Sequence, residues 1–148
     1  MDKPLIKIEQ LTIFSPKDAK YIKLLATQLG SEFQPFSKKD LKDMLTSTAT
    51  HLFVAREPKT QKIVGMITLI VYRIPYVKKA YLDDVIVDED FRGQKIGSLL
   101  MEKALAHAKN SGATFADLTA HPSRTEANLL YAKFGFKKRN TNVYRLTL

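Results

Sequence analysis

The chain has 148 residues, 45% of them hydrophobic, which excludes wholesale disorder and predicts one compact domain over residues 1–148. It has no cysteine, only three histidines and no apolar run of about 18 residues, so disulfides, a covalent acyl-cysteine and a membrane-spanning helix are excluded, and we expect a soluble, cytoplasmic protein without a metal. The net charge of +9 fits either a solubilising surface or an anionic partner, and nucleic acid is the weaker alternative because no RNA-binding or zinc-finger motif occurs.

The first third of the chain is expected to form one strand and two helices. The stretch "LIKIEQLTI" (5–13) partly alternates between apolar and polar residues and predicts a strand. Helical spacing of apolar residues follows over 16–29 and 38–48. Ser15 and Ser37 stand directly before these helices, where a serine side chain accepts from a free backbone N–H, so both are expected N-caps.

The middle of the chain is expected to form a hairpin, a further strand and a long helix. The stretches "HLFVARE" (51–57) and "KIVGMITLIVYRIP" (62–75) flank the turn "PKTQ" and predict the hairpin. The stretch "AYLDDVIVDE" (80–89) predicts the next strand. A turn, "FRGQKIGSLL" (91–100), then leads into a helix that we expect to end near Asn110.

The last third is expected to add a strand, a helix and a closing pair of strands. The strand is "TFADLTA" (114–120), and the helix spans 123–134, where Ser123 and Glu126 have the spacing of a capping box. The closing pair is expected in "FKKRNTNVYRLTL" (136–148). The whole pattern predicts an α/β domain of the α+β type, built around a largely antiparallel sheet with flanking helices.

The turn at 91–100 has residues that suit an anion. It follows a β-branched strand and opens a helix, and it contains Gly93, Gly97 and the cations Arg92 and Lys95. Free N–H groups at a helix start bind phosphate oxygens, and glycine lets a ligand approach the backbone closely. The spacing differs from that of a P-loop and from the dinucleotide fingerprint. These residues alone therefore leave two interpretations open, a phosphate-binding turn and an ordinary helix start.

Two segments together resemble the hallmark motifs of the GNAT N-acetyltransferase superfamily. They are "VIVDEDFRGQKIGSLLMEKAL" (85–105) and "EANLLYAKFGF" (126–136), in the family's order and at a typical separation. The resemblance covers about residues 81–136. The family loop, [QR]-x-x-G-x-[GA], would begin at Arg92, and Lys95 stands where the family usually has glycine. Lys95 is thus a departure, although its amide can still donate and its side chain adds positive charge.

The resemblance implies a fold and a co-substrate. The fold would be a mixed, mostly antiparallel sheet of six to seven strands whose middle strands splay apart, and the co-substrate would be acetyl-CoA. The free strand edge at Val85, Ile86 and Val87 would bond the pantetheine amides. Side-chain packing in the core explains the same valines equally well. The diphosphate would sit on the turn, which contains Arg92, Gly93, Gln94, Lys95, Ile96, Gly97 and Ser98.

The second motif and the strand before the turn supply candidate catalytic groups. Asn128 and Tyr131 match the family's CoA-contacting asparagine and its tyrosine near the sulfur, although a tyrosine on a helix is more often a core residue. We expect Tyr131 to protonate the departing thiolate. Asp83 and Asp84 are candidate bases, and strand alternation would let only one face the groove. A carboxylate needs a raised pKa or a water chain to deprotonate an ammonium; the alternatives are that one aspartate pairs with a lysine and that the other binds the substrate amine.

The function expected from this resemblance is direct transfer of an acetyl group from acetyl-CoA to a primary amine of a small molecule or a protein. No motif identifies the acceptor, and a homodimer stays open as a partner. Two alternatives come from other classes of protein. One is a catalytically silent acyl-CoA-binding regulatory domain, and the other is a basic nucleic-acid-binding module.

Overall fold

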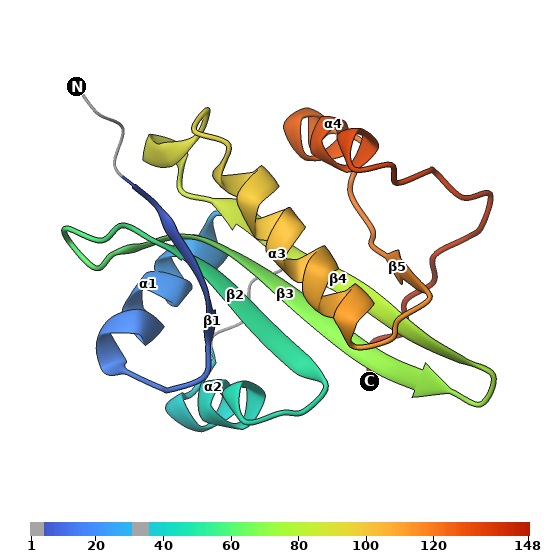
Figure 1. Ribbon diagram of the computed structural model, residues 1–148, viewed down its shortest axis with the longest axis horizontal. Helices are drawn as coiled ribbons and strands as arrows, with labels where there is room; N and C mark the ends of the chain where they lie inside the picture. The colour runs from blue at the N-terminus through green and yellow to red at the C-terminus, as the bar shows by residue number, and fades with distance from the viewer. Residues whose placement is uncertain (1–4, 31–35) are drawn as a thin grey trace.

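The structure, a computed structural model that describes residues 5–30 and 36–148, is built on a five-stranded sheet in the order β1-β2-β3-β4-β5 (Figure 1). The first three pairs of neighbouring strands are antiparallel, and β4 and β5 are parallel. The predicted α/β class with a largely antiparallel sheet is therefore confirmed. The strands are β1 (Lys7–Leu11), β2 (Thr50–Arg56), β3 (Ile63–Ile74), β4 (Val77–Val87) and β5 (Phe115–Asp117).

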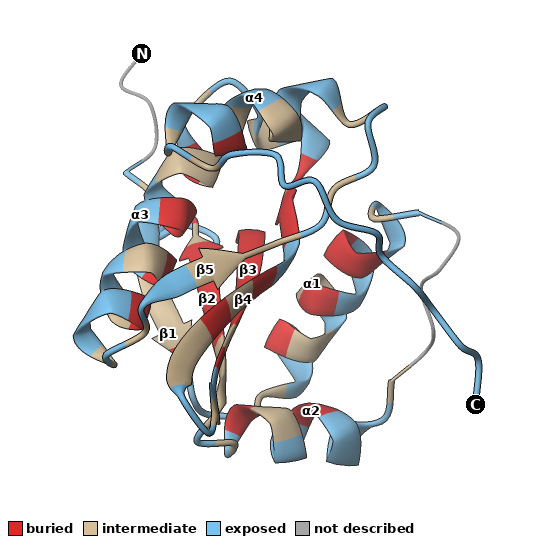
Figure 2. Cartoon of the chain, turned by 90° about the vertical axis from the view of Figure 1, so that its right-hand side faces the viewer, coloured by how far each residue is buried: buried red, intermediate tan, exposed pale blue. Residues whose placement is uncertain are grey.

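Helices cover both faces of this sheet (Figure 2). One face packs against α1 and α2, and the other against α3 and α4. A single 3-10 turn, Glu89–Phe91, separates β4 from α3. Within the described residues, no helix has the length and apolarity needed to cross a bilayer. The helices are α1 (Pro16–Thr27), α2 (Lys38–Leu45), α3 (Ile96–Asn110) and α4 (Thr125–Lys133).

The two N-terminal helices start where the sequence predicts. The Ser15 hydroxyl oxygen accepts from the Asp18 N–H at 3.1 Å. At α2 the caps are reciprocal, because Ser37 Oγ accepts from the Asp40 N–H and Asp40 Oδ2 accepts from the Ser37 N–H. Each cap satisfies N–H groups that the first helical turn leaves free. The prediction of both N-caps is confirmed.

The capping box predicted for the last helix is wrong. The helix begins at Thr125, Arg124 occupies the N-cap position, and no side chain caps the helix. Ser123 Oγ instead lies 2.7 Å from His121 Nδ1 in the preceding turn. This local bond uses the hydroxyl that a capping box with Glu126 would need, and it delays the helix start by two residues.

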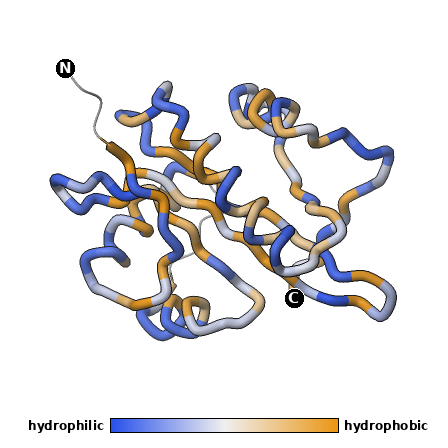
Figure 3. Tube along the Cα trace, in the orientation of Figure 1, coloured by the Kyte–Doolittle hydropathy of each residue, from blue (hydrophilic) through white to orange (hydrophobic). Residues whose placement is uncertain are grey.

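The sheet is buried on both faces. Along β2, Phe53 packs toward α3 and α4, and Val54 packs toward α1 and α2. In β3, Ile67 and Met66 divide between the same two cores. A strand covered on both faces reads as a continuous hydrophobic run instead of an alternating one, and Figure 3 shows these central strands as largely hydrophobic.

The closing pair of strands predicted in 136–148 does not form, so the described residues contain five sheet strands and not six or seven. Residues 137–148 are all exposed, including Val143 at 76%, Tyr144 at 86% and Leu146 at 81%. A two-stranded hairpin is marginal unless one face packs on a core. This segment has no such cover, and its first half is rich in lysine and arginine, as the hydrophilic stretch after α4 in Figure 3 shows.

An ion-pair network ties the N-terminal elements together. The Arg56 guanidinium on β2 donates from Nη1 and Nη2 to the two carboxylate oxygens of Asp18 on α1, at 2.9 and 3.1 Å. Its Nε donates to Glu9 on β1 at 2.7 Å. The side chains of Arg56 and Asp18 are only 11% and 12% exposed. The hydrogen bond from Arg56 lowers the pKa of Asp18 below its ordinary value, so this carboxylate stays charged inside the fold.

Candidate functional site

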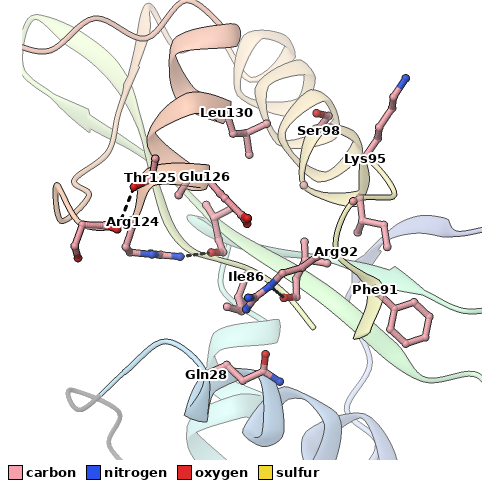
Figure 4. A pocket seen from close by; sticks show the side chains of 17 residues that line it. Gln28, Ile86, Phe91, Arg92, Lys95, Ser98, Arg124, Thr125, Glu126 and Leu130 are labelled. Carbon is pink, nitrogen blue, oxygen red and sulfur yellow. Dashed lines mark hydrogen bonds between the residues drawn. The ribbon is translucent and has the colours of Figure 1, made fainter. Parts of the chain in front are cut away.

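A cavity of about 490 Å³ opens beside the end of β4 (Figure 4). Three segments form most of its wall: the last residues of β4, the turn into α3, and the start of α4. Gln28, just after α1, also contributes. The lining residues are Gln28, Val85, Ile86, Val87, Phe91, Arg92, Gly93, Lys95, Ile96, Gly97, Ser98, Ser123, Arg124, Thr125, Glu126, Ala127 and Leu130.

The end of β4 has a free edge on the cavity side. β4 and β5 pair only where Lys79–Tyr81 meets Phe115–Asp117, so the two strands separate beyond that point, as the resemblance implies. Asp88 N–H bonds to the carbonyl of Val64 on β3 at 2.9 Å. Because backbone groups along a strand point alternately to its two edges, Ile86 faces β3, while Val85 and Val87 direct their carbonyls away from it.

Those two carbonyls face arginine side chains. Arg124 Nη2 donates to the Val85 carbonyl at 3.1 Å, and Arg92 Nε donates to the Val87 carbonyl at 3.3 Å. Figure 4 shows both guanidinium groups directed from the cavity wall toward β4. The free edge of β4 therefore offers acceptors that are strong enough to hold cationic donors.

The two helices that start at the cavity lack side-chain caps. No side-chain cap bond forms at α3 or α4, whereas α1 and α2 are capped by serines. In α3 the first helical bond runs from the Leu99 N–H to the Lys95 carbonyl at 3.1 Å. The N–H groups of Ile96, Gly97 and Ser98 therefore remain available, and together with the positive end of the helix dipole they suit an anion.

The charge of the cavity wall also suits an anion. Its cationic side chains are Arg92, Lys95 and Arg124, against the single carboxylate Glu126 in the described lining. Gly97 brings the start of α3 close to α4, because a Cβ at this position would lie 3.3 Å from Leu130 Cδ2. The wall is thus positive, and Gly97 lets the start of α3 pack closely against α4.

Lys95, the departure from the family loop, adopts a left-handed backbone conformation with φ 63° and ψ 15°. This region favours glycine and costs other residues roughly 1 kcal/mol or more. The chain therefore places a charged side chain at a position whose backbone would be relaxed with glycine.

Replacing Lys95 with glycine is expected to raise the free energy of unfolding by about 0.5 to 1 kcal/mol, because the relief of left-handed strain exceeds the extra entropy of the unfolded chain. The midpoint of urea denaturation measures this change. Lys103→Gly, in the interior of α3, is the matched control and should destabilise by about 1 kcal/mol. A loss of stability in Lys95→Gly would contradict the prediction.

The two candidate aspartates stand at a β-bulge. The register of β3 and β4 shifts between Met66 and Thr68, and Asp84 has a φ of 52°. Leu82 and Val85, three residues apart, consequently pack into the same core. The regular alternation expected for this strand is therefore wrong, because the bulge inserts one residue.

The electrostatic surroundings separate the two carboxylates. Desolvation by the surrounding protein raises the pKa of Asp84, although the residue keeps an exposed surface; the negative charge of Asp83 raises it further, and a hydrogen bond with Thr68 opposes both. The pKa of Asp84 is therefore shifted in the direction that an aspartate base would require.

Tyr131 lies in the core beside the cavity. It is 6% exposed and packs edge-to-face on Phe136, with ring centroids 6.1 Å apart. Burial raises the pKa of its phenol, the positive charge of Arg124 lowers it, and the charge of Asp83 raises it. Within the described residues no side-chain hydrogen bond is made by the Tyr131 hydroxyl.

Asn128 holds the backbone turn before α4 in place. Its side-chain amide donates to the Arg124 carbonyl at 2.8 Å and to the His121 carbonyl at 3.0 Å. Asn128 itself does not line the cavity. These bonds hold the turn that carries Arg124.

The structure brings most of the predicted site together. Val85, Ile86 and Val87 and all the predicted turn residues except Gln94 line the cavity, whereas Asp83, Asp84, Asn128 and Tyr131 lie outside its lining. Gln28, Phe91 and the first turn of α4 were not predicted as part of the site. Arg124, just before the second motif, is a cation for which the sequence leaves two interpretations open, a contact with a CoA phosphate and a solvated surface position. Among the described residues, no group of three or more His, Cys, Asp or Glu residues is arranged to hold a metal ion.

Solved structures share this fold. An acetyltransferase from Trypanosoma brucei superposes with a TM-score of 0.80 at 21% identity, covering 97% of this chain and 99% of its own. A glucosamine-6-phosphate N-acetyltransferase from Arabidopsis thaliana gives 0.78 at 18% identity, with 96% and 98% covered. An aminoglycoside acetyltransferase from an uncultured soil metagenomic sample gives 0.78 at 22% identity, with 97% of each chain covered. At these identities the likeness concerns the fold.

Two sequence comparisons reach further. An uncharacterized N-acetyltransferase of Methanocaldococcus jannaschii is 33% identical over 60 residues, which are 40% of this chain and 26% of that protein. The chain thus matches about a quarter of the length of this relative. The family model described as "Acetyltransferase (GNAT) family" matches residues 19–136, which include the free edge of β4, the turn and α4. The chain therefore belongs to the acetyltransferase (GNAT) family.

Proposed function

We propose that the protein transfers an acetyl group from acetyl-CoA directly to a primary amine. The observation that carries this proposal is the free edge of β4, with the carbonyls of Val85 and Val87 beside the uncapped start of α3. A strand edge suits a ligand with amide groups, and a helix start suits a diphosphate. Both lie in the wall of one cavity.

The residues present fit acetyl-CoA. The carbonyls of Val85 and Val87 would accept from the pantetheine amides. The N–H groups of Ile96, Gly97 and Ser98 would donate to the diphosphate, and the cationic wall would balance its charge. When bound, acetyl-CoA supplies an acetyl thioester.

Tyr131 is the proposed proton donor. Its phenol is protonated near neutral pH, as that of an ordinary tyrosine is, and burial raises the pKa further; Tyr131 lies one residue after Leu130, which lines the cavity. It donates this proton to the sulfur as the carbon–sulfur bond breaks and the carbon–nitrogen bond forms. No cysteine occurs in the sequence, so acetyl transfer through a cysteine thioester is excluded.

Asp84 is the proposed acceptor of the amine's proton, and Asp83 the proposed second carboxylate of the amine site. The pKa of Asp84 is raised by burial and by Asp83, which makes it a better base at neutral pH than an ordinary aspartate. Two carboxylates side by side also attract an ammonium group. The amine thus arrives as a cation and loses its proton at the place where it reacts.

The proposed acceptor is a primary amine of a small molecule or a protein. Two of the structures with this fold are named for amino-sugar acceptors, glucosamine-6-phosphate and aminoglycosides. Amino sugars are therefore the first compounds to screen, followed by polyamines and lysine peptides.

Acetyl-CoA is expected to stabilise the fold by about 2.7 kcal/mol at 100 times its Kd, because a ligand that binds only the folded state shifts the unfolding equilibrium. Differential scanning fluorimetry measures the shift in Tm. In Gly97→Asp the shift should disappear, because the substitution puts a negative charge beside the free N–H groups that would hold the diphosphate. Thr12→Asp, an exposed site in the connection before α1, adds the same charge elsewhere and should keep the shift.

The outcomes separate the alternatives. Absence of a Tm shift at millimolar acetyl-CoA would overturn the proposal. Binding of acetyl-CoA, with no free CoA thiol released in the presence of any amine in the screen, would indicate a silent regulatory domain. Binding to oligonucleotides with a steep dependence on salt would indicate a nucleic-acid-binding module.

A further inference from the structure

Arg92 and Arg124 occupy the two acceptors on which the proposed function depends. Arg124 Nη2 donates to the Val85 carbonyl and Arg92 Nε to the Val87 carbonyl. The two arginines come from opposite sides of the cavity, one from the turn before α3 and one from the start of α4 (Figure 4). Between them they cover the carbonyls of the two residues at the end of β4, Val85 and Val87, that face away from β3.

Neither guanidinium is in direct contact with a carboxylate of the described chain, although Asp88 is near enough to interact with the charge of Arg92. Within the described residues, no carboxylate oxygen lies within 4 Å of Arg92 or Arg124, whereas Arg56 on the other face of the sheet holds two carboxylates. A backbone carbonyl satisfies a donor but leaves the positive charge uncompensated. Both arginines are thus held in place by a bond weaker than one to an anion.

A carbonyl oxygen has two lone pairs, but the two guanidinium groups occupy the outward side of the strand edge, from which the N–H of a neighbouring strand or ligand would approach. A ligand amide that adds to the edge of β4 needs the Val85 and Val87 carbonyls with their lone pairs directed into the cavity. The guanidinium groups stand in that path. Ligand binding at this edge therefore requires the arginines to leave it.

The arginines have a second place to go within the same cavity. The N–H groups of Ile96, Gly97 and Ser98 mark the anion site at the start of α3, and Arg92 and Arg124 both line the wall beside it. The bonds from Asn128 fix the turn at the Arg124 carbonyl. Only the long side chain has to move, and a planar guanidinium binds phosphate oxygens better than it binds a carbonyl.

We propose that Arg92 and Arg124 are displaceable caps of the β4 edge, which cover the Val85 and Val87 carbonyls in the free protein and transfer to the ligand's phosphates when the ligand's amides take over those carbonyls. This proposal rests on the proposed function. It makes the phosphates of the donor a requirement for opening the edge. A donor without phosphates has to displace the caps with no compensating contact, so the caps select phosphorylated acyl donors.

Arg124→Met tests the exchange with two ligands, acetyl-CoA and S-acetyl-pantetheine, which shares the amides and the thioester but has no phosphate. The Kd of acetyl-CoA should rise about tenfold or more, because a charged contact is lost. The Kd of S-acetyl-pantetheine should fall by roughly two- to tenfold, because one bond no longer has to be broken. NMR titration of the methyl groups of Val85 and Val87 measures both constants, including millimolar ones.

Arg92→Met should give the same opposite changes, and it carries the test if Arg124→Met does not fold. Arg73→Met, at an exposed position near the far end of β3, is the matched control and should change neither constant. The Tm of each variant without ligand should stay within a few degrees of the wild type.

Opposite shifts for the two ligands support the caps. An unchanged or weaker affinity for S-acetyl-pantetheine, with weaker binding of acetyl-CoA, would mean that the arginines are ordinary phosphate contacts, and the proposal would be overturned. Unchanged binding of both ligands would overturn it as well. A wild-type protein that binds neither ligand would instead remove the proposed function on which the caps depend.

Discussion

Tyr131→Phe is expected to lower kcat by roughly 10- to 10,000-fold, around the range for loss of a general acid. The substitution removes one hydroxyl and keeps the ring, so the packing on Phe136 and the rest of the core is preserved. If Tyr131 serves only as a core residue, activity should hardly change. The affinity for acetyl-CoA should stay nearly the same in either case, because the hydroxyl acts when the sulfur departs.

Two further measurements distinguish a catalytic role of Tyr131 from a structural one. The loss should shrink with acyl donors whose thiols are more acidic, since a better leaving group needs less protonation. Single-turnover kinetics are needed, because slow product release can hide the effect on the chemical step. Tyr72→Phe, at a partly exposed position on β3, is the control. Wild-type kcat in Tyr131→Phe under single-turnover conditions would return this residue to a structural role.

Arg56→Met is expected to lower the free energy of unfolding by about 3 kcal/mol, because it leaves the little-exposed carboxylate of Asp18 without its cationic partner and leaves Glu9 with Lys7 alone. For a chain of this size that corresponds to a fall in Tm of about 6 to 12 °C. Urea denaturation at neutral pH measures the loss. A loss below about 1 kcal/mol would show that water replaces the guanidinium.

Lys39→Met is the matched control, since Lys39 and Asp43 form an ion pair with side chains 83% and 62% exposed. It should change stability by less than about 0.5 kcal/mol. Acid should remove the difference between Arg56→Met and the wild type. The pKa of Asp18 is lower in the folded state, so its contribution is present above its unfolded pKa of about 3.9 and is lost as the pH falls through the folded pKa. The two stability curves should therefore converge in strong acid.

Features that depend on neighbours in sequence could be predicted. The serine caps of α1 and α2, the hairpin of β2 and β3 and the helix after the turn all depend on residues a few positions apart, and each occurs where the pattern indicates. The closing strands could not be predicted correctly, because alternation shows that a segment can be a strand but not whether a sheet edge is available to it. Ser123 bonds to His121 instead of capping the last helix. The sequence pattern alone does not show which of these two local bonds is the more stable.

In the candidate site, too, some features follow from local sequence motifs and others depend on contacts between distant residues. The turn and the free edge of β4 follow from the two motifs, because the family resemblance fixes their order. The bulge at Asp84 could not be predicted, since it arises from the register between β3 and β4, and two consecutive aspartates do not report it. The bond from Arg124 to the Val85 carbonyl joins residues 39 positions apart. Contacts of this kind become visible only when the chain is folded.

The short parallel pairing of β4 with β5 also affects how the protein folds. β5 reaches β4 only after the whole of α3 has been traversed, and it is held there by three residue pairs, so this connection closes a long loop with the shortest strand pairing in the sheet. β5 and α4 should accordingly join the fold late and open locally with a lower free energy than the β2–β3–β4 sheet. The cavity exists only while this unit is closed. A ligand that spans from β4 to α4 therefore stabilises the least cooperative part of the molecule.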